Sequence, residues 1–106
     1  MKRKVIISSL FSKDVRGTVD YIRRDKPIAA QKFKGLIKNK VRSLILMAER
    51  GRIVPETINY KNSVCYREII IGNYRLIYRM TKESVFVLRL IHGHQNISFE
   101  KVQGLE

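Results

Sequence analysis

The fold of this chain is decided between residues 66 and 79, where the sequence reads YREIIIGNYRLIYR. Two runs rich in branched and aromatic residues flank the dipeptide Gly72-Asn73, which is typical of a tight turn between antiparallel strands. A hairpin closed at this turn pairs Ile71 with Tyr74, Ile69 with Leu76 and Arg67 with Tyr78. This face is mostly apolar, and we expect helices to cover it.

The other face of the predicted hairpin is more polar, and a one-residue register slip would exchange the two faces. It consists of Tyr66, Glu68, Ile70, Arg75, Ile77 and Arg79. A third strand, Val85–Ile91, follows a turn at Thr81–Ser84. A four-residue turn would put Arg89 on the apolar face, where an unpaired arginine is costly. We therefore expect an odd-length turn or a bulge that places Arg89 beside Arg75, on an open face with three arginines and one glutamate.

The N-terminal half has the pattern of one short strand and two helices. Val5–Ser9 is a branched run that suits a strand, and Ser12–Arg24 has a capping serine followed by apolar residues at helical spacing. After a break at Pro27, a second amphipathic helix is predicted over Ile28–Arg50, and Arg52–Ser63 is predicted as a loop. The predicted fold is therefore α+β with the order βααβββ: a twisted, mainly antiparallel sheet with an N-terminal helical hairpin packed on one face.

Length, charge and cysteine content limit the class of protein. At 106 residues the chain fits one domain, which we take to span residues 1–106. Its formal net charge is +13, of which the residues up to Ile53 carry +11, and this excess favours polyanionic partners. The single Cys65 excludes an intramolecular disulfide. Because the apolar runs are too short for a signal peptide or a membrane span, we expect a cytoplasmic protein with no membrane partner.

Several stretches, in their order and spacing, resemble the RelE/ParE superfamily of bacterial type II toxin–antitoxin toxins. They are Tyr66–Ile70, Gly72–Arg79 and Val87–Gly93, with Asp25–Ala30, Gly51–Glu56 and the βααβββ order in support. The resemblance implies a small basic toxin that an antitoxin holds inactive. RelE-like members cleave mRNA at the ribosome, whereas ParE-like members poison DNA gyrase. The helical hairpin and His92-Gly93 favour the ParE-like group, although many of its sequences have two arginines where this chain has His94 and Gln95.

A RelE-like nuclease would need a base, an acid and cations around the phosphate. By resemblance to the YoeB-like branch, Arg75 is a candidate catalytic cation and Glu56 a candidate base. His92 and His94 could serve as acid or base, because histidine titrates near neutral pH. Each role has a structural alternative, such as an ion pair of Arg75 with Glu68 on the same face. The two histidines have no third ligand nearby, so we predict no metal and no cofactor.

Target binding would instead use aromatic and basic residues, and Tyr66 could stack on a nucleobase. The candidate binding residues are Tyr66, Arg67, Arg79, Arg89, Lys34 and Lys38. The two lysines lie on a helix in which basic residues outnumber acidic ones, so the helix cannot neutralise its own charge. A nucleic acid or an acidic antitoxin would supply the counter-charge. We expect a partly disordered acidic antitoxin that lays a helix between the two predicted helices or adds a strand at a sheet edge, forming a hetero-oligomer with the toxin.

Three functions are compatible with this sequence. The first is a ParE-like toxin that inhibits growth through DNA gyrase. The second is a RelE-like, metal-independent mRNA endoribonuclease that acts at the ribosome. The third is a non-toxic basic module that binds nucleic acid or a partner protein. We favour the first over the second because the predicted open face carries arginines but no lysine.

Overall fold

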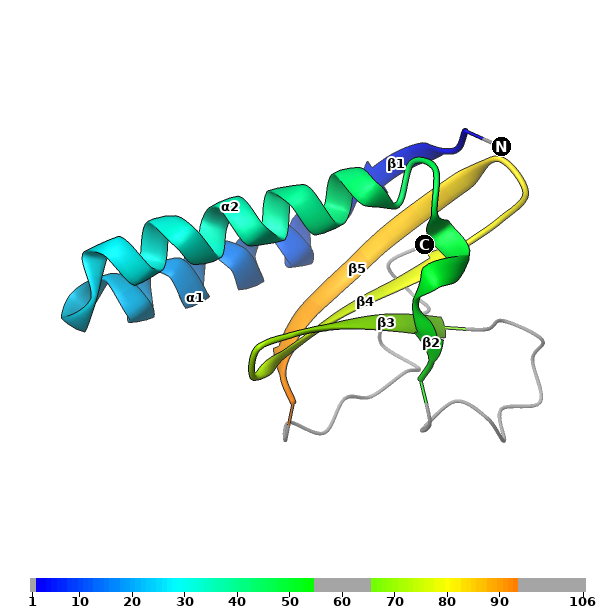
Figure 1. Ribbon diagram of the computed structural model, residues 1–106. Helices are drawn as coiled ribbons and strands as arrows, with labels where there is room; N and C mark the ends of the chain where they lie inside the picture. The colour runs from blue at the N-terminus through cyan, green and yellow to red at the C-terminus, as the bar shows by residue number, and fades with distance from the viewer. Residues whose placement is uncertain (1, 55–65, 94–106) are drawn as a thin grey trace.

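A five-stranded sheet and a helical hairpin make up the structure, a computed structural model that describes residues 2–54 and 66–93 (Figure 1). In chain order the elements are β1 (Lys4–Ile7), α1 (Ser9–Asp25), α2 (Pro27–Ser43), the short 3-10 helix η1 (Ala48–Arg50), β2 (Arg52–Ile53), β3 (Tyr66–Ile71), β4 (Tyr74–Met80) and β5 (Ser84–His92). The strands are ordered β1-β5-β4-β3-β2; β1 is parallel to β5, and the other neighbouring pairs are antiparallel. The predicted α+β class and mainly antiparallel sheet are confirmed.

The hairpin of β3 and β4 has the predicted register. Ile71 lies opposite Tyr74, Ile69 opposite Leu76 and Arg67 opposite Tyr78. Gly72 adopts a φ of 59°, which a residue without a Cβ adopts at little cost. The apolar face of the hairpin belongs to the main core, together with residues of both helices and of β5: Phe11, Ile37, Leu44, Ile69, Ile71, Leu76, Val85, Val87 and Leu90.

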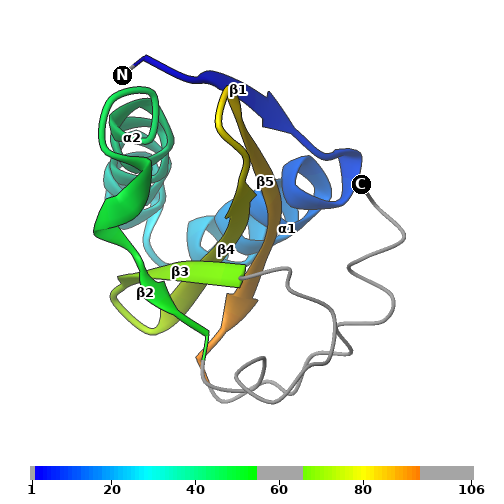
Figure 2. The ribbon, with the colours of Figure 1, turned by 90° about the vertical axis from the view of Figure 1, so that its right-hand side faces the viewer.

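The helices α1 and α2 lie side by side and antiparallel on this face, and their far end extends beyond the sheet (Figures 1 and 2). Pro27 starts α2, where its missing N–H is not needed. Phe11 and Val19 are the buried residues of α1, and Ala30 and Ile37 those of α2. Neither helix is apolar over a length that could cross a bilayer, within the residues that the structure describes.

The predicted start of the first helix is wrong, because the cap is Ser8 and not Ser12. The Ser8 Oγ accepts a hydrogen bond from the Phe11 N–H at 3.0 Å and donates to the carbonyl of Leu88 at 2.7 Å. The backbone N–H of Ser8 also donates to the Val87 carbonyl. Ser8 therefore ends β1 and begins α1 in one step, so that the helix starts beside β5.

The predicted end of the second helix is also wrong, because α2 stops at Ser43 and not at Arg50. The Ser43 Oγ donates to the carbonyl of Lys40 at 2.6 Å, a local bond that competes with the helical pattern. Leu44 is fully buried, and its N–H bonds to the carbonyls of Val41 and Arg42 as the chain turns towards η1. The apolar residues Leu44 and Ala48, which suggested a longer helix, are instead buried in the segment that follows it.

Part of the predicted loop is a strand. Arg52 and Ile53 form β2, which lies opposite Glu68 and Arg67 at the edge of β3. A two-residue strand is too short to leave an alternating pattern in the sequence. Residues 55–65, which include most of the predicted loop, lie outside the described residues.

The predicted bulge is present, in the pairing of β4 with β5. Ile77 lies opposite Arg89, but Tyr78 lies opposite Val87, so Leu88 is the extra residue. Arg89 nevertheless does not join Arg75, because its guanidinium contacts Asp14 of α1. The register does place Arg89 on the face of Arg75 and Ile77, as predicted. The expectation that this face is open is wrong, because Tyr66, Glu68 and Ile77 on it are buried.

Candidate functional site

The polar face of the sheet centres on the buried carboxylate of Glu68. Its Oε1 accepts a hydrogen bond from Arg75 Nε at 2.6 Å, and its Oε2 accepts one from Arg52 Nε at 2.5 Å. The side chain of Glu68 is fully buried and that of Arg75 is 8% exposed, whereas that of Arg52 is 62% exposed. Arg75 therefore forms the ion pair with Glu68 that was its structural alternative, and its catalytic role stays a prediction. Sequence reasoning missed Arg52, because its segment was assigned to a loop.

The structure does not bring Arg75 and His92 together. Tyr74 and Arg75 are consecutive residues of β4, so their side chains project from opposite faces of the sheet. His92 lies opposite Tyr74 and packs edge-on against its ring, with the ring centroids 5.5 Å apart. Arg75 contacts Glu68 on the other face. The sheet thus separates two residues that the predicted nuclease would use at one phosphate.

The remaining candidates of the predicted nuclease are Glu56 and His94, and both lie outside the described residues. Their roles stay predictions. Within residues 2–54 and 66–93, no three histidine, cysteine, aspartate or glutamate side chains are grouped so that they could hold a metal ion.

Tyr66 and Arg79 are both engaged within the sheet. Tyr66 is fully buried in a second apolar cluster, with Val54, Ile77, Leu88 and Ile91. Its ring has no exposed surface in this structure. Base stacking would require the ring to become accessible, and this role of Tyr66 stays a prediction. The guanidinium carbon of Arg79 lies 4.6 Å from the ring centroid of Phe86, which is cation–π geometry.

Arg67 and Tyr78 hold η1 and the following glycine against the sheet. Arg67 Nη1 donates to the carbonyl of Gly51 at 2.8 Å. The Tyr78 hydroxyl donates to the carbonyl of Ala48 at 2.5 Å and accepts from the Gly51 N–H at 3.0 Å. Burial raises the pKa of Tyr78 above its ordinary value. A Cβ at Gly51 would lie 2.9 Å from the carbonyl oxygen of Glu68, so only glycine fits here.

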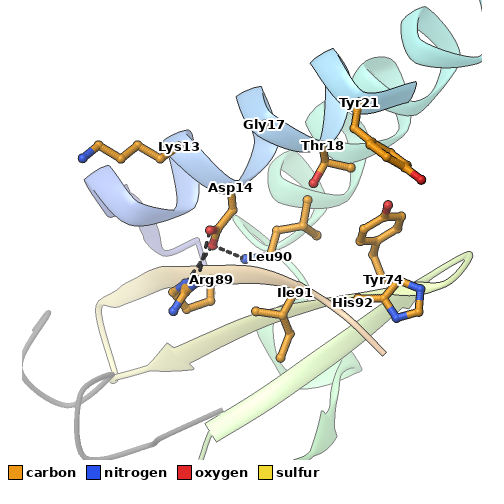
Figure 3. Close-up of a pocket in the computed structure, with 10 residues that line it drawn as sticks. All are labelled: Lys13, Asp14, Gly17, Thr18, Tyr21, Tyr74, Arg89, Leu90, Ile91 and His92. Atoms are coloured by element: carbon orange, nitrogen blue, oxygen red, sulfur yellow. Dashed lines mark hydrogen bonds and ion pairs between the residues drawn. The ribbon is translucent and has the colours of Figure 1, made fainter. Parts of the chain in front are cut away.

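Arg89 and His92 line a pocket of 370 Å³ between α1 and β5 (Figure 3). The carboxylate of Asp14 accepts hydrogen bonds from Arg89 Nε at 2.7 Å and Nη2 at 3.2 Å, and from the backbone N–H of Leu90 at 3.0 Å. Sequence reasoning missed Asp14, because 75 positions separate it from Arg89. The available signal was chemical: an arginine removed from water needs hydrogen-bond acceptors, and a carboxylate is the strongest of them.

A larger hollow of 760 Å³ between α1 and α2 contains both predicted lysines. Its apolar part is formed by Phe11, Val15, Val19, Ile37 and Val41. Its basic residues are Arg16, Arg23, Lys34 and Lys38. Asp20 is the acidic residue of this lining and pairs with Arg23 at 3.0 Å. An apolar floor with basic residues around it fits an amphipathic helix of acidic character.

Comparison with known proteins identifies one family model and similar solved structures. Residues 5–97 match the family model for the ParE toxin of the type II toxin–antitoxin system, parDE. Among solved structures, a chain of the chromosomal ParDE toxin–antitoxin system from P. aeruginosa is similar, with a TM-score of 0.68 and 16% sequence identity. The alignment covers 86% of this chain and 96% of that chain, and at this identity the likeness concerns the fold. No curated protein matches the sequence.

Proposed function

This chain belongs to the ParE family of type II toxin–antitoxin toxins, and we propose that it inhibits growth by binding DNA gyrase, without cleaving RNA itself. The observation that carries the proposal is the family match over residues 5–97. The geometry of the sheet supports it. Arg75 is held by the buried Glu68, and His92 lies on the opposite face against Tyr74.

The proposed antitoxin site is the hollow between α1 and α2. Its apolar floor needs a cover of apolar side chains, and Lys34 and Lys38 need acidic partners. An amphipathic helix with an acidic edge would supply both. Neutralisation would follow from occupation of this hollow, while the sheet keeps its internal ion pairs.

The deciding experiment expresses the full chain and measures two products side by side. One is mRNA cleavage in a ribosome-containing extract, and the other is trapped gyrase–DNA breaks with loss of supercoiling. We expect DNA breaks with intact messages. Message cleavage that Arg75→Lys abolishes would select the nuclease instead, and lysine is used because it keeps a positive charge beside Glu68. Normal growth with abundant folded protein would select the non-toxic module.

A further inference from the structure

The pocket between α1 and β5 is built on a straight line of helix residues. Lys13, Gly17 and Tyr21 are spaced four residues apart, so they lie on one face of α1. The helical rise from Lys13 to Tyr21 is about 12 Å. Strand β1 pairs with β5 only as far as Val87, and α1 faces β5 beyond that point (Figure 3).

Gly17 keeps the middle of this line open. A Cβ built at Gly17 would meet no atom within 4 Å, so internal packing does not require glycine here. Glycine in a helix interior is less favourable than alanine. The position thus leaves bare backbone above the pocket, and a larger side chain would fill the space.

The two ends of the pocket differ in chemistry, as Figure 3 shows. At one end lies the ion pair of Arg89 with Asp14, and the Lys13 side chain extends outward from the rim of this end. Asp14 holds the guanidinium of Arg89 through two hydrogen bonds, so that its orientation is fixed before any ligand arrives. This end fits an oxyanion.

The other end is aromatic and rich in hydroxyl groups. Tyr21 is 70% exposed, and Tyr74 rises from the sheet towards it (Figure 3). The Tyr74 ring is itself supported by His92, at 5.5 Å between centroids. The Thr18 hydroxyl lies on the same side of the pocket. Tyr74 is half-buried and also packs against Phe33, with the ring centroids 5.2 Å apart, so Tyr21 carries most of the exposed aromatic surface. An exposed tyrosine ring is a surface on which a nucleobase stacks.

We infer that this pocket binds a nucleotide, with its phosphate at the Lys13 and Arg89 end and its base at the Tyr21 and Tyr74 end. A volume of 370 Å³ and a line of about 12 Å suit one nucleotide. The nucleotide is either free or part of a single strand, because both offer the same phosphate and base. This inference goes beyond the proposed action on gyrase and does not rest on it.

The test titrates the full chain with AMP, adenosine, inorganic phosphate and a short single-stranded DNA, followed by calorimetry and tyrosine fluorescence. We expect AMP to bind at least about tenfold more tightly than adenosine or phosphate, because only AMP reaches both ends. Gly17→Leu should weaken AMP binding by at least about tenfold. Leucine is a better helix residue than glycine and meets open space, so this variant should fold.

Gly35→Leu is the matched control, since Gly35 also lies in a helix with no atom within 4 Å of an added Cβ but lines the other hollow. It should leave AMP binding unchanged. If Gly17→Leu also weakens DNA binding, the site takes a nucleotide within a strand; if only AMP binding falls, the ligand is a free nucleotide. No binding of AMP, equal binding of phosphate and AMP, or AMP binding that survives Gly17→Leu would overturn the inference.

Discussion

Glu68 sets the electrostatics of the sheet at the scale of a single residue. It is fully buried and accepts hydrogen bonds from Arg52 and Arg75, and Arg75 is nearly buried as well. A buried charge is tolerated when it is paired and becomes very costly when its partner is removed. The pair of Glu68 with Arg75 should therefore contribute more to stability than the pair of Glu68 with Arg52, because the Arg52 side chain is largely exposed to water.

Glu68→Ala should destabilise the chain by about 3–5 kcal/mol, because it leaves the Arg75 guanidinium buried without its carboxylate. Urea unfolding followed by circular dichroism measures the loss. Asp20→Ala is the control, because it breaks an exposed pair with Arg23 and should cost less than about 1 kcal/mol. The double variant Glu68→Met with Arg75→Met should recover much of the stability. Equal losses for Glu68→Ala and Asp20→Ala would contradict the assignment of a buried pair.

Tyr78 gives a prediction for alkaline pH. Burial raises the pKa of its hydroxyl above the unfolded value of about 10. The folded state therefore holds this proton more strongly than the unfolded state does. Its contribution to stability is complete below about pH 10 and is lost as the pH rises through the folded pKa.

Urea unfolding between pH 8 and 11 compares the chain with Tyr78→Phe. At pH 8 the variant should be less stable by about 1–3 kcal/mol, since the Gly51 N–H and the Ala48 carbonyl lose their buried partner. Above about pH 10 the difference should shrink, because the ionised hydroxyl no longer stabilises the fold. Tyr21→Phe, at a 70% exposed position, should not change with pH in this way. A difference that stays constant up to pH 11 would refute the raised pKa.

At the scale of elements, Ser8 couples the first strand to the first helix. Its hydroxyl caps α1 and also donates to the carbonyl of Leu88, the extra residue of the bulge in β5. Ser8→Ala should therefore cost about 1–2 kcal/mol, near the upper part of the range for a lost helix cap. Ser12→Ala should be neutral or slightly stabilising, because alanine is the better residue inside a helix. Thermal melts of the two variants decide between the two serines, and equal effects would contradict the cap at Ser8.

Short-range signals predicted the elements well where the deciding interaction was local. The turn at Gly72-Asn73 set the register of β3 and β4, and the cost of a buried arginine predicted the bulge. The prediction failed where a distant partner decides. Ser8 is the cap because its hydroxyl also hydrogen-bonds to the Leu88 carbonyl of β5. The helix α2 ends at Ser43 because the chain turns at the buried Leu44. No pattern within either segment contains that information.

The same division applies to the candidate site. Lys34 and Lys38 lie together in one hollow because they share a face of the amphipathic helix α2, and their predicted role in binding stays a prediction. The sequence did not predict that Arg89 would pair with Asp14, or that Arg75 and His92 would lie on opposite faces. These facts depend on long-range packing of α1 against β5 and on the parity of residues along β4.

At the scale of the whole molecule, a net charge of +13 should govern binding of the antitoxin. Lys38→Glu should weaken the complex by at least about tenfold, because it places an acid in the proposed groove. Lys32→Glu makes the same charge change on α2 outside the groove and should weaken it much less. Affinities at two salt concentrations measure both effects. Equal weakening by the two substitutions would place the antitoxin elsewhere.

The pairing of β1 with β5 has a consequence for how the protein is made. Lys4 lies beside Ser84, so the first strand to leave the ribosome has no neighbour until β5 has been translated. Contacts between such distant segments also slow folding. A nascent chain interrupted before Ser84 would lack the strand against which β1 and α1 pack, and it should be harmless. Toxicity would then require translation through β5, which gives a co-translated antitoxin time to meet its target.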